Sequence, residues 1–407
     1  MTATPIITVA QMRAMDAAAP GAGVPVRALM ERAGEAVAQA IFDRFSPRPT
    51  AVLCGPGANG GDGWVCAQRL HRAGWPVWVE TLVPRESLTG DALDAASDFS
   101  GPIVPLGDPT APAAELAVDA LFGAGLNKPL EGAARAAALA WANRPEAVVA
   151  VDVPSGLPGD GGQPVGDVAF QAGLTVSFEA LKPAHVLEPG RSFCGEIVVA
   201  PIGMPPTARS AAGPPIAVAN GPALWGSAFP RPGVQAHKHA RGHAMVVSGG
   251  LTQTGAARLA AMSALRAGAG LVTVLSPPDA LLAHAAHLTA VMLRKVSDAE
   301  ALEDAVAGAH AVVIGPALGV APVHREAVLA ALRAPARLVL DADVFTLFRD
   351  DSQALFDNLG VQDVLTPHVG EFNRAFPGLL TGAPNRIAAV KEASAKAGAV
   401  VLLKGPD

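Results

Sequence analysis

The sequence predicts an α/β protein with two domains, each built around a parallel β-sheet. The chain has 407 residues, of which 50% are hydrophobic, and this is enough apolar material for two cores. Short apolar runs alternate with helical segments in two blocks, and a proline-rich stretch separates the blocks. Continuous apolar runs of this kind are typical of strands that helices cover on both faces of a parallel sheet.

The composition argues against several classes of partner. The net charge of −6 and the aromatic content of 4%, with no tyrosine, disfavour a nucleic-acid-binding surface. The three cysteines, Cys54, Cys66 and Cys194, are widely spaced, which fits a reducing compartment better than a disulfide framework or a zinc site. No signal peptide and no 18-residue apolar span are found. We therefore expect a soluble cytoplasmic protein that binds a small molecule and no membrane.

The first block is organised around the glycine-rich sequence VLCGPGANGGDG at 52–63. A strand is predicted at 51–54 and a helix at 64–71. Five glycines fall within nine residues: Gly55, Gly57, Gly60, Gly61 and Gly63. We expect a ligand loop, because glycine permits positive φ and lets a phosphate approach backbone N–H groups. Asn59 and Asp62 would add side-chain oxygens. The spacing matches neither standard nucleotide fingerprint, and the alternative is a tight turn with Asp62 as the helix N-cap.

The other elements of the first block alternate along the chain. Apolar spacing predicts two helices within residues 8–45, separated by a break at 20–23. Helices are also predicted at 91–98 and 133–143, and strands at 77–82, 117–121, 148–152, 175–178 and 197–199.

Polar residues follow three of these strands. They are Asn59 with Asp62, Asp119 with the loop 122–131, and Asp152 with Ser155. In a parallel sheet, ligands bind beyond the carboxyl ends of the strands. The three clusters therefore predict one ligand site at that edge of the sheet.

Residues 201–236 are rich in proline and have little periodicity, so we expect an interdomain linker with one short strand. The second block predicts strands at 244–248, 271–275, 311–315, 337–343, 363–367 and 400–404, and helices at 255–267, 322–333 and 386–398. Its polar residues again follow strands, among them Asp341, Asp343, His368 and Lys404. A nucleotide-binding domain of this type would continue with a further helix after Lys404, so we expect the chain to be truncated.

Several motifs together resemble those of the bifunctional NAD(P)H-hydrate repair enzymes. They are LMERAG (29–34), CGPGANGGDGWVCAQRL (54–70), VDALFGAGL (118–126), VDVPSGL (151–157), FEALKP (178–183), GLVTV (270–274), TPHVGEF (366–372) and LLKGPD (402–407). The resemblance covers essentially the whole chain. It implies a Rossmann-like three-layer αβα NAD(P)HX epimerase domain at 1–205, a linker at 206–236, and at 237–407 a ribokinase-like, ADP-dependent dehydratase domain that lacks its C-terminal end.

The resemblance also implies which residues of the first domain bind the substrate, bind potassium and catalyse the reaction. The hydrated dinucleotide would lie against Ala58, Asn59, Gly60, Gly61, Asp62, Gly123, Ala124, Gly125, Leu126, Asn127, Lys128, Pro129 and Asp152. Asn59, Asp119 and Ser155 would hold a potassium ion, for which oxygen donors are the suitable ligands. Asp152 and Lys182 are the implied catalytic residues. The Asp152 carboxyl would protonate the departing hydroxyl or assist ring opening, and the proton would then be returned, while Lys182 would stabilise charge or share in the proton transfer.

Alternatives remain open for the two catalytic candidates. Asp152 would also fit as a turn-capping aspartate before Pro154, and Lys182 as a surface lysine. The family usually has asparagine at the position of Ala58, so one polar contact with the ligand is missing here.

In the second domain the resemblance implies contacts with the substrate or with ADP and Mg²⁺. The positions are Ala256, Gly319, His368, Lys404, Gly405, Pro406 and Asp407. His368 would also fit as a structural histidine. The sequence departs from the family's pattern in the loop GGLTQTG (249–255), at Ala317, where glycine is usual, and in DADVF (341–345). The family's G-T-G-D segment does not occur, so we expect no dehydratase activity from this chain.

The leading hypothesis is thus an enzyme of nicotinamide nucleotide repair, which interconverts (R)- and (S)-NAD(P)HX and, at full length, dehydrates the S form. One alternative is a non-catalytic scaffold with an epimerase-like domain. The presence of Asn59, Asp119, Asp152 and Ser155 favours the enzyme. A ribokinase-like small-molecule kinase is the other alternative, but it would leave the first domain unexplained. A homo-oligomer is compatible with the sequence.

Overall fold

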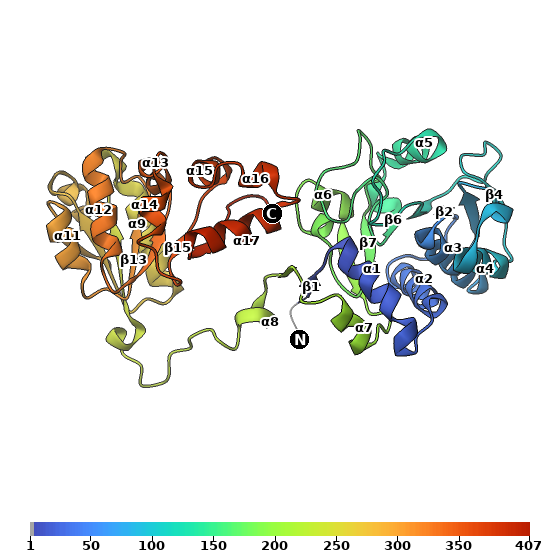
Figure 1. The fold of residues 1–407 in the computed structure, drawn as a ribbon, viewed down its shortest axis with the longest axis horizontal. Coiled ribbons are helices and arrows are strands. Elements are labelled where there is room, and N and C mark those ends of the chain that lie inside the picture. Colours follow the sequence, from blue (N-terminus) through green and yellow to red (C-terminus); the bar gives the residue numbers. More distant parts are fainter. Residues whose placement is uncertain (1–3) are drawn as a thin grey trace. The chain divides into compact units, whose positions relative to one another are not determined.

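The computed structural model describes residues 4–407, which divide into two compact units (Figure 1). The first unit runs through Ser227, and the second runs from Ala228 to Pro406. Both are α/β units built around a parallel sheet, as the sequence predicts, and each main sheet has seven strands.

The sheet of the first unit has the strand order β4-β3-β2-β5-β6-β7-β8, and all neighbouring strands are parallel. The strands are β2 (Thr50–Cys54), β3 (Val77–Thr81), β4 (Ile103–Pro105), β5 (Leu116–Ala120), β6 (Val148–Val151), β7 (Leu174–Phe178) and β8 (Glu196–Ala200). The helices are α1 (Val9–Ala18), α2 (Val26–Phe42), α3 (Ala58–Arg72), α4 (Gly90–Asp98), α5 (Gly132–Trp141), α6 (Gly190–Cys194), α7 (Pro206–Ala211) and α8 (Pro222–Trp225).

Two apolar clusters cover the two faces of this sheet. Successive strand residues point to opposite faces, so Val52 packs with α2 and α3, whereas Leu53 packs with α5. Ile41 and Leu70 lie in the first cluster, and both are fully buried. The result is the three-layer αβα arrangement that the sequence predicts.

The helix α3 begins at Ala58, so the loop after β2 is only three residues long, and the last three of the five glycines lie in the first turns of the helix. None of its five glycines has a positive φ, and the prediction of that conformation was wrong. The glycines instead allow close packing. A Cβ at Gly60 would lie 1.9 Å from the carbonyl oxygen of Gly55, and one at Gly63 would lie 2.5 Å from Cβ of Ala120. Gly57 occupies the N-cap, so the alternative role of Asp62 as the cap is also wrong.

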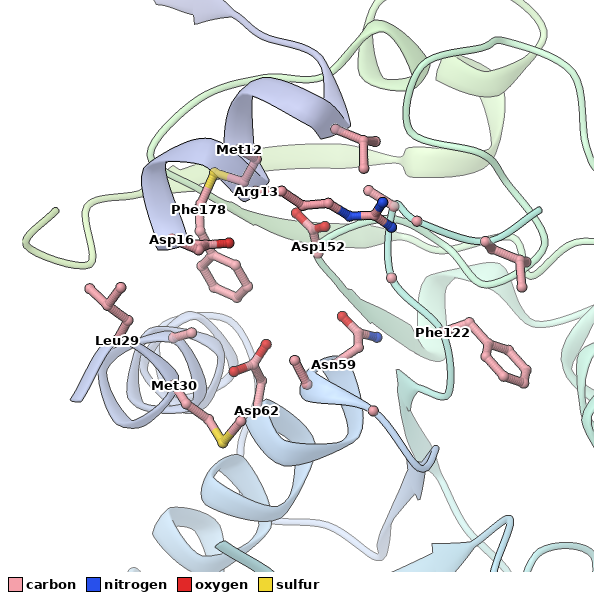
Figure 2. A pocket seen from close by; sticks show the side chains of 18 of the residues that line it. Met12, Arg13, Asp16, Leu29, Met30, Asn59, Asp62, Phe122, Asp152 and Phe178 are labelled. Carbon is pink, nitrogen blue, oxygen red and sulfur yellow. The ribbon is translucent and has the colours of Figure 1, made fainter. Parts of the chain in front are cut away.

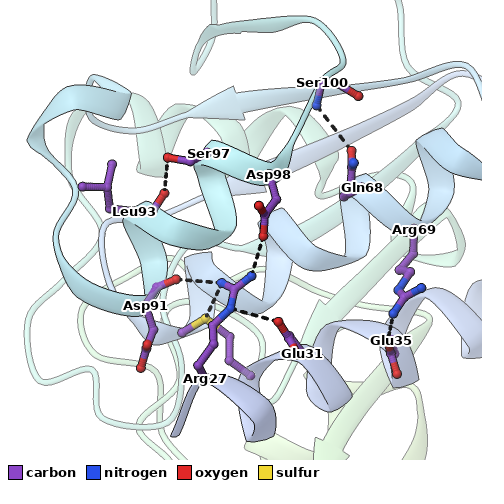
Figure 3. Close-up of polar contacts among 11 residues, drawn as sticks. Arg27, Glu31, Glu35, Gln68, Arg69, Asp91, Leu93, Ser97, Asp98 and Ser100 are labelled. Carbon is purple, nitrogen blue, oxygen red and sulfur yellow. Dashed lines mark hydrogen bonds and ion pairs between the residues drawn. The ribbon is translucent and has the colours of Figure 1, made fainter. Parts of the chain in front are cut away.

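Polar contacts join α2, α3 and α4 on the surface of the first unit (Figure 3). The Arg27 guanidinium donates to the carboxylates of Glu31 at 3.1 Å and Asp98 at 2.8 Å. Arg69 of α3 forms an ion pair with Glu35 of α2. Arg27 thus ties α2 to α4, and the Arg69–Glu35 pair ties α2 to α3.

The stretch expected to be a linker contains ordered elements. α7 packs on α1, and β9 (Ala217–Val218) pairs with β1 (Pro5–Ile6) in an antiparallel two-stranded sheet. The side-chain amide of Gln11 in α1 donates to the carbonyl oxygens of Ala212 and Pro214. This segment therefore helps to hold α1 in place.

The sheet of the second unit has the order β12-β11-β10-β13-β14-β15-β16 and is parallel throughout. The strands are β10 (His243–Val247), β11 (Leu271–Ser276), β12 (Met292–Lys295), β13 (Ala311–Ile314), β14 (Arg337–Leu340), β15 (Val364–Leu365) and β16 (Val400–Val401). The helices are α9 (Thr254–Ala267), α10 (Leu281–Ala285), α11 (Ala299–Val306), α12 (Pro322–Leu332), α13 (Asp343–Leu347), α14 (Ser352–Phe356), α15 (Val369–Ala375), α16 (Leu379–Gly382) and α17 (Arg386–Ala397).

The sequence missed the outermost strand at one end of each sheet. β4 is short and ends in proline, and β12 is mostly exposed and carries Arg294 and Lys295. Edge strands need no continuous apolar run, so their sequences lack that signal. Within residues 4–407, no helix is both long and apolar enough to cross a membrane.

Candidate active site

A cavity of about 570 Å³ lies in the first unit, at the carboxyl ends of the strands (Figure 2). Its walls come from α1, α2, the first turns of α3, the loop after β5, and residues that follow β6 and β7. The lining includes Arg13, Asp16, Asn59, Asp62, Asp152 and Lys182. The predicted convergence of polar strand ends is therefore present, and these ends line a cavity that is open to solvent.

Asp152 and Lys182 form a buried ion pair in this cavity. Nζ of Lys182 lies 2.5 Å from Oδ1 of Asp152, and the two side chains are 2% and 15% exposed. The hydroxyl of Ser177 also donates to Oδ1 of Asp152 and accepts from Nζ of Lys182 at 3.0 Å. Burial would raise the pKa of Asp152, but the charge and the hydrogen bond of Lys182 lower it below its usual value. Asp152 is thus held as a carboxylate, and Lys182 is not a surface lysine.

His185 fixes the backbone around this pair. Its Nδ1 accepts a hydrogen bond from the N–H of Lys182 at 3.0 Å, so Nε2 carries the proton and donates to the carbonyl oxygen of Asp152 at 2.8 Å. Burial, followed by the charge of Lys182, lowers the pKa of His185 to about 4, which keeps the ring neutral. Asp152 has a φ of 64°. A positive φ in a residue other than glycine, held by its surroundings, is typical of functional sites.

Asp119 and Ser155 form a second polar network, behind the cavity wall. The carboxylate of Asp119 accepts from the N–H of Ser155 at 2.7 Å and from its hydroxyl at 2.6 Å. The same hydroxyl accepts from the N–H of Phe122 at 2.9 Å. Burial raises the pKa of Asp119 to about 6, although the hydrogen bonds from Ser155 and Leu121 oppose this shift.

Asn59 and Ser155, two of the expected potassium ligands, each contact the loop after β5. Asn59 lies against Gly123, where an added Cβ would be 3.1 Å from Oδ1 of Asn59, and Gly123 directly follows Phe122 of the Asp119–Ser155 network. The buried Nδ2 of Asn59 has no hydrogen-bond partner. The donor set of amide, hydroxyl and carboxylate oxygens suits a hard monovalent cation. Among the described residues, no group of three or more His, Cys, Asp or Glu side chains could hold a metal ion.

Two further carboxyl groups, those of Asp16 and Asp62, line the cavity. Burial raises the pKa of Asp16 to about 6, with Lys182 opposing the shift and Asp152 adding to it. Burial also raises the pKa of Asp62 well above its usual value, and the charges of Asp152 and Asp16 add to this. The site therefore combines one carboxylate paired with Lys182, the Asp62 carboxyl, for which burial favours the neutral form, and Asp16, whose pKa of about 6 leaves it mostly ionised at pH 7.

The structure separates the predicted dinucleotide residues into two groups. One group lines the cavity: Ala58, Asn59, Asp62, Gly123, Ala124, Gly125, Leu126, Asn127 and Asp152. Gly60 and Gly61 are not in this lining, because they pack against Gly55 and Met30. Lys128 and Pro129 are exposed and also lie outside the lining.

Arg13 and Asp16 of α1 were not among the predicted site residues. The two residues are three positions apart in a helix, which places both side chains on one face. That spacing is visible in the sequence QMRAMD, but only the folded chain places this face of α1 on the cavity.

In the second unit, Lys404 and His368 come together at the carboxyl ends of the strands. Nζ of Lys404 lies 2.5 Å from Oδ1 of Asp341 and 3.8 Å from Oε2 of Glu371. Nδ1 of His368 accepts from the N–H groups of Gly370 and Glu371, so His368 caps α15. The structural role is therefore present, and 54% of the His368 side chain is exposed.

The other predicted residues of this unit lie in loops and at a helix start. Ala256 lies in the first turn of α9. Gly319 has a φ of 102°, and its N–H donates to Asp343 at 2.9 Å. A Cβ at Gly249 would lie 1.8 Å from the carbonyl oxygen of Ala317, so the loops before α9 and after β13 are in close contact. Gly405, Pro406 and Asp407 are exposed.

Two family models match the chain, one in each unit. The model described as "YjeF-related protein N-terminus" matches residues 26–184, and that described as "NAD(P)H-hydrate dehydratase" matches residues 244–407. A bifunctional NAD(P)H-hydrate repair enzyme of Coxiella burnetii is 32% identical, covering 97% of this chain and 80% of the relative. One from Pyrobaculum aerophilum is 35% identical, covering 98% of this chain and 81% of the relative.

Solved structures show weaker likeness. A yeast protein is 24% identical with a TM-score of 0.43, over 52% of this chain and 94% of its own. An ADP/ATP-dependent NAD(P)H-hydrate dehydratase from Bacillus subtilis, co-crystallised with ATP and Mg²⁺, is 25% identical with a TM-score of 0.34, over 43% and 62%. Neither adds to what the family models show.

The fold, the cavity and the matches place the chain in a class of two-domain α/β enzymes that act on nucleotides. More particularly, the chain belongs to the family of bifunctional NAD(P)H-hydrate repair enzymes. The resemblance inferred from the motifs is thereby confirmed, as is the pairing of an epimerase-type with a dehydratase-type domain. The expected loss of dehydratase activity finds no support, because the dehydratase family model matches the second unit.

Proposed function

We propose that the first unit interconverts the R and S epimers of NADHX and NADPHX. The observation that carries this proposal is the cavity, which the buried Asp152–Lys182 pair lines together with the start of α3 and the loop after β5. The first turn of α3 has no side-chain cap, so its N–H groups remain for an anionic ligand. The hydrated ring would lie at Asp152, and the dinucleotide would extend along residues 123–127.

Epimerisation at C6 requires one bond at that carbon to break and to form again with the opposite stereochemistry. The bond is either the C–O bond to the hydroxyl, with water adding to the other face, or the C–N bond of the ring, which then opens and closes again. Asp152 is held as a carboxylate, so it first accepts a proton. The proton comes from the attacking water if the C–O bond breaks, or from the substrate's hydroxyl if the ring opens. This reverses the order expected from the sequence, in which Asp152 first donates. The carboxyl of Asp62, for which burial favours the neutral form, can supply a proton to the departing hydroxyl. Lys182 keeps Asp152 charged and stabilises negative charge beside the ring.

We also propose a potassium site at Asn59, Asp119 and Ser155. A bound cation would neutralise part of the charge on the pyrophosphate. It would also favour the charged form of Asp119, whose pKa burial raises. The three residues hold the loop at Phe122 and Gly123, so the ion would order the surface on which the dinucleotide lies.

The test is epimerisation of (R)-NADHX with and without potassium, with the epimers separated by chromatography over time. The proposal expects equilibration that potassium accelerates and that Asp152→Ala abolishes. Ser155→Ala should retain activity but lose most of the potassium effect. If the purified chain equilibrates the epimers no faster than buffer does, the non-catalytic scaffold becomes the better account of the first unit.

For the second unit we propose ADP-dependent dehydration of (S)-NAD(P)HX, with Mg²⁺ bound together with the nucleotide. Lys404 is positioned to meet the phosphates as a point charge, and His368 exposes its ring near Lys404. The test is formation of NADH from (S)-NADHX, followed by its absorbance, with ADP and Mg²⁺ present or omitted. Phosphorylation of an added sugar or pyrimidine without dehydration would instead favour the kinase.

We place the enzyme in the cytoplasm, where its three free, buried cysteines would stay reduced.

A further inference from the structure

Arg13 is the cation of the cavity that no carboxylate neutralises. Among the described residues that line the cavity, the cationic side chains are those of Arg13 and Lys182. Lys182 is paired with Asp152 at 2.5 Å. No ion pair joins Arg13 to a carboxylate within residues 4–407, although Asp16 lies one turn further along the same helix. Arg13 therefore carries a full positive charge that is available to a ligand.

The guanidinium lies directly against the loop that follows β5. A Cβ at Gly125 would be 2.6 Å from Nη2 of Arg13, so the absence of a side chain at this position makes room for the guanidinium. The neighbouring loop residues Gly123, Ala124 and Leu126 also line the cavity. A ligand along this loop would therefore meet Arg13 on one side and the first turn of α3 on another (Figure 2).

Several contacts hold α1 in the position that directs Arg13 toward the cavity. Thr8 and Gln11 form a capping box at its start. The N–H of Val9 donates to the carboxylate of Asp160 at 2.7 Å. Gln11 donates to the carbonyl oxygens of Ala212 and Pro214 at 3.0 and 2.8 Å. The helix is thus fixed at one end by groups more than 150 residues away in sequence, so Arg13 is placed before any ligand binds.

We propose that Arg13 binds a phosphate group of the dinucleotide, which makes α1 part of the substrate site. The inference rests on the proposed epimerase function, because a dinucleotide supplies the phosphates. The planar guanidinium matches two phosphate oxygens with two parallel hydrogen bonds. The phosphate is either in the pyrophosphate or, in NADPHX, at the 2′ position, and the chemistry of recognition is the same for both.

The experiment compares the KM and kcat of epimerisation for the wild type, Arg13→Gln and Arg13→Lys, with NADHX and with NADPHX. Loss of the guanidinium should raise KM about tenfold or more with little change in kcat, and lysine should restore part of the loss. Arg72→Gln is the matched control, because Arg72 is exposed at the far end of α3 and lies outside the cavity. Equal losses for the two substrates would place Arg13 at the pyrophosphate, and a loss confined to NADPHX would place it at the 2′-phosphate.

An unchanged KM for both substrates in Arg13→Gln would overturn this inference and leave the epimerase proposal standing. A binding assay with ADP-ribose tests the phosphate site even if the epimerase proposal fails. ADP-ribose contains the pyrophosphate but has no nicotinamide ring to be epimerised. If the wild type is inactive yet ADP-ribose raises its Tm, and Arg13→Gln abolishes that rise, the proposed activity fails and the phosphate site stands. If ADP-ribose and its 2′-phosphorylated form each affect both proteins equally, Arg13 does not bind phosphate.

Discussion

The two units place the same kind of ion pair at the carboxyl ends of their sheets, but they bury it to different extents. In both, a lysine Nζ lies 2.5 Å from an aspartate Oδ1. In the first unit, the side chains of Lys182 and Asp152 are 2% and 15% exposed. In the second, those of Lys404 and Asp341 are 40% and 25% exposed.

This difference shows that the distance between two charges does not by itself determine how much the loss of one of them destabilises the protein. Loss of one partner from a buried pair leaves an unneutralised charge away from water, whereas water solvates the remaining partner of an exposed pair. Removal of either Asp152 or Lys182 by itself should therefore be strongly destabilising. Lys404 can leave Asp341 with little loss, and it is free to turn toward the phosphates of a nucleotide.

The largest expected effect follows from this comparison. Lys182→Ala should lower the free energy of unfolding of the first unit by about 3–5 kcal/mol. Lys404→Ala should lower that of the second unit by at most about 1 kcal/mol. All five tryptophans (Trp64, Trp75, Trp78, Trp141 and Trp225) lie in the first unit, so their fluorescence during denaturation reports on it, and circular dichroism follows the whole chain.

A double variant distinguishes the burial of charge from simple loss of packing. Asp152→Ala combined with Lys182→Ala removes both charges, so it should be more stable than Lys182→Ala by itself. Equal losses from Lys182→Ala and Lys404→Ala would show that burial does not separate the two pairs.

The glycines at the helix starts that follow β2 and β10 give the second contrast. Gly60 lies in the first turn of α3, where a Cβ would meet the carbonyl oxygen of Gly55 at 1.9 Å. Gly255 lies in the first turn of α9 and has open space around its Cβ position. Gly60→Ala should therefore destabilise the first unit by about 1–3 kcal/mol and raise the KM of epimerisation. Gly255→Ala should stabilise the second by up to about 1 kcal/mol. The same denaturation assays measure both, and a tolerated Gly60→Ala would contradict the close packing.

The sequence predicted the sheets well because their strands are buried on both faces, and burial leaves an apolar run. It also placed Asn59, Asp119 and Asp152 at one edge, since that edge follows from strand order. It gave the wrong physical reason for Gly60, because a clash with Gly55 depends on how closely α3 packs. Arg13 was missed for a related reason, since the position of α1 depends on contacts with groups far away in the sequence.

The third prediction uses the pKa of Asp16, which burial raises from the usual 3.8 to about 6. The folded chain therefore holds a proton at Asp16 between these values, where the unfolded chain has lost it. The free energy of unfolding consequently falls as the pH rises from about 4 to 6. Above pH 6, where Asp16 is charged in both states, the loss is complete and no longer changes with pH. Asp16→Asn removes that cost, so it should stabilise the first unit by about 1–2 kcal/mol above pH 6, allowing for solvent screening, and by little below pH 4.

Denaturation followed by tryptophan fluorescence at pH 4 and pH 7.5 measures this difference. Asp94→Asn is the control, because Asp94 is exposed on α4 and lies outside the cavity. A stabilisation by Asp16→Asn that is the same at both pH values would show that the charge of Asp16 is not its cause.

The smallest effect concerns the backbone, where both units hold a residue other than glycine at positive φ after a strand. Asp152 has a φ of 64° and Ala317 a φ of 54°. At Asp152 the strain places a carboxylate beside Lys182, so glycine there would remove the group that the site needs. The Ala317 side chain is a methyl group without such a role, and the resemblance to the repair enzymes predicts glycine at its position. Ala317→Gly should therefore stabilise the second unit by about 0.5–1 kcal/mol, as amide hydrogen exchange in β13 and β14 would measure. A loss of protection in these strands would mean that the methyl group contributes more by packing than the strained backbone loses.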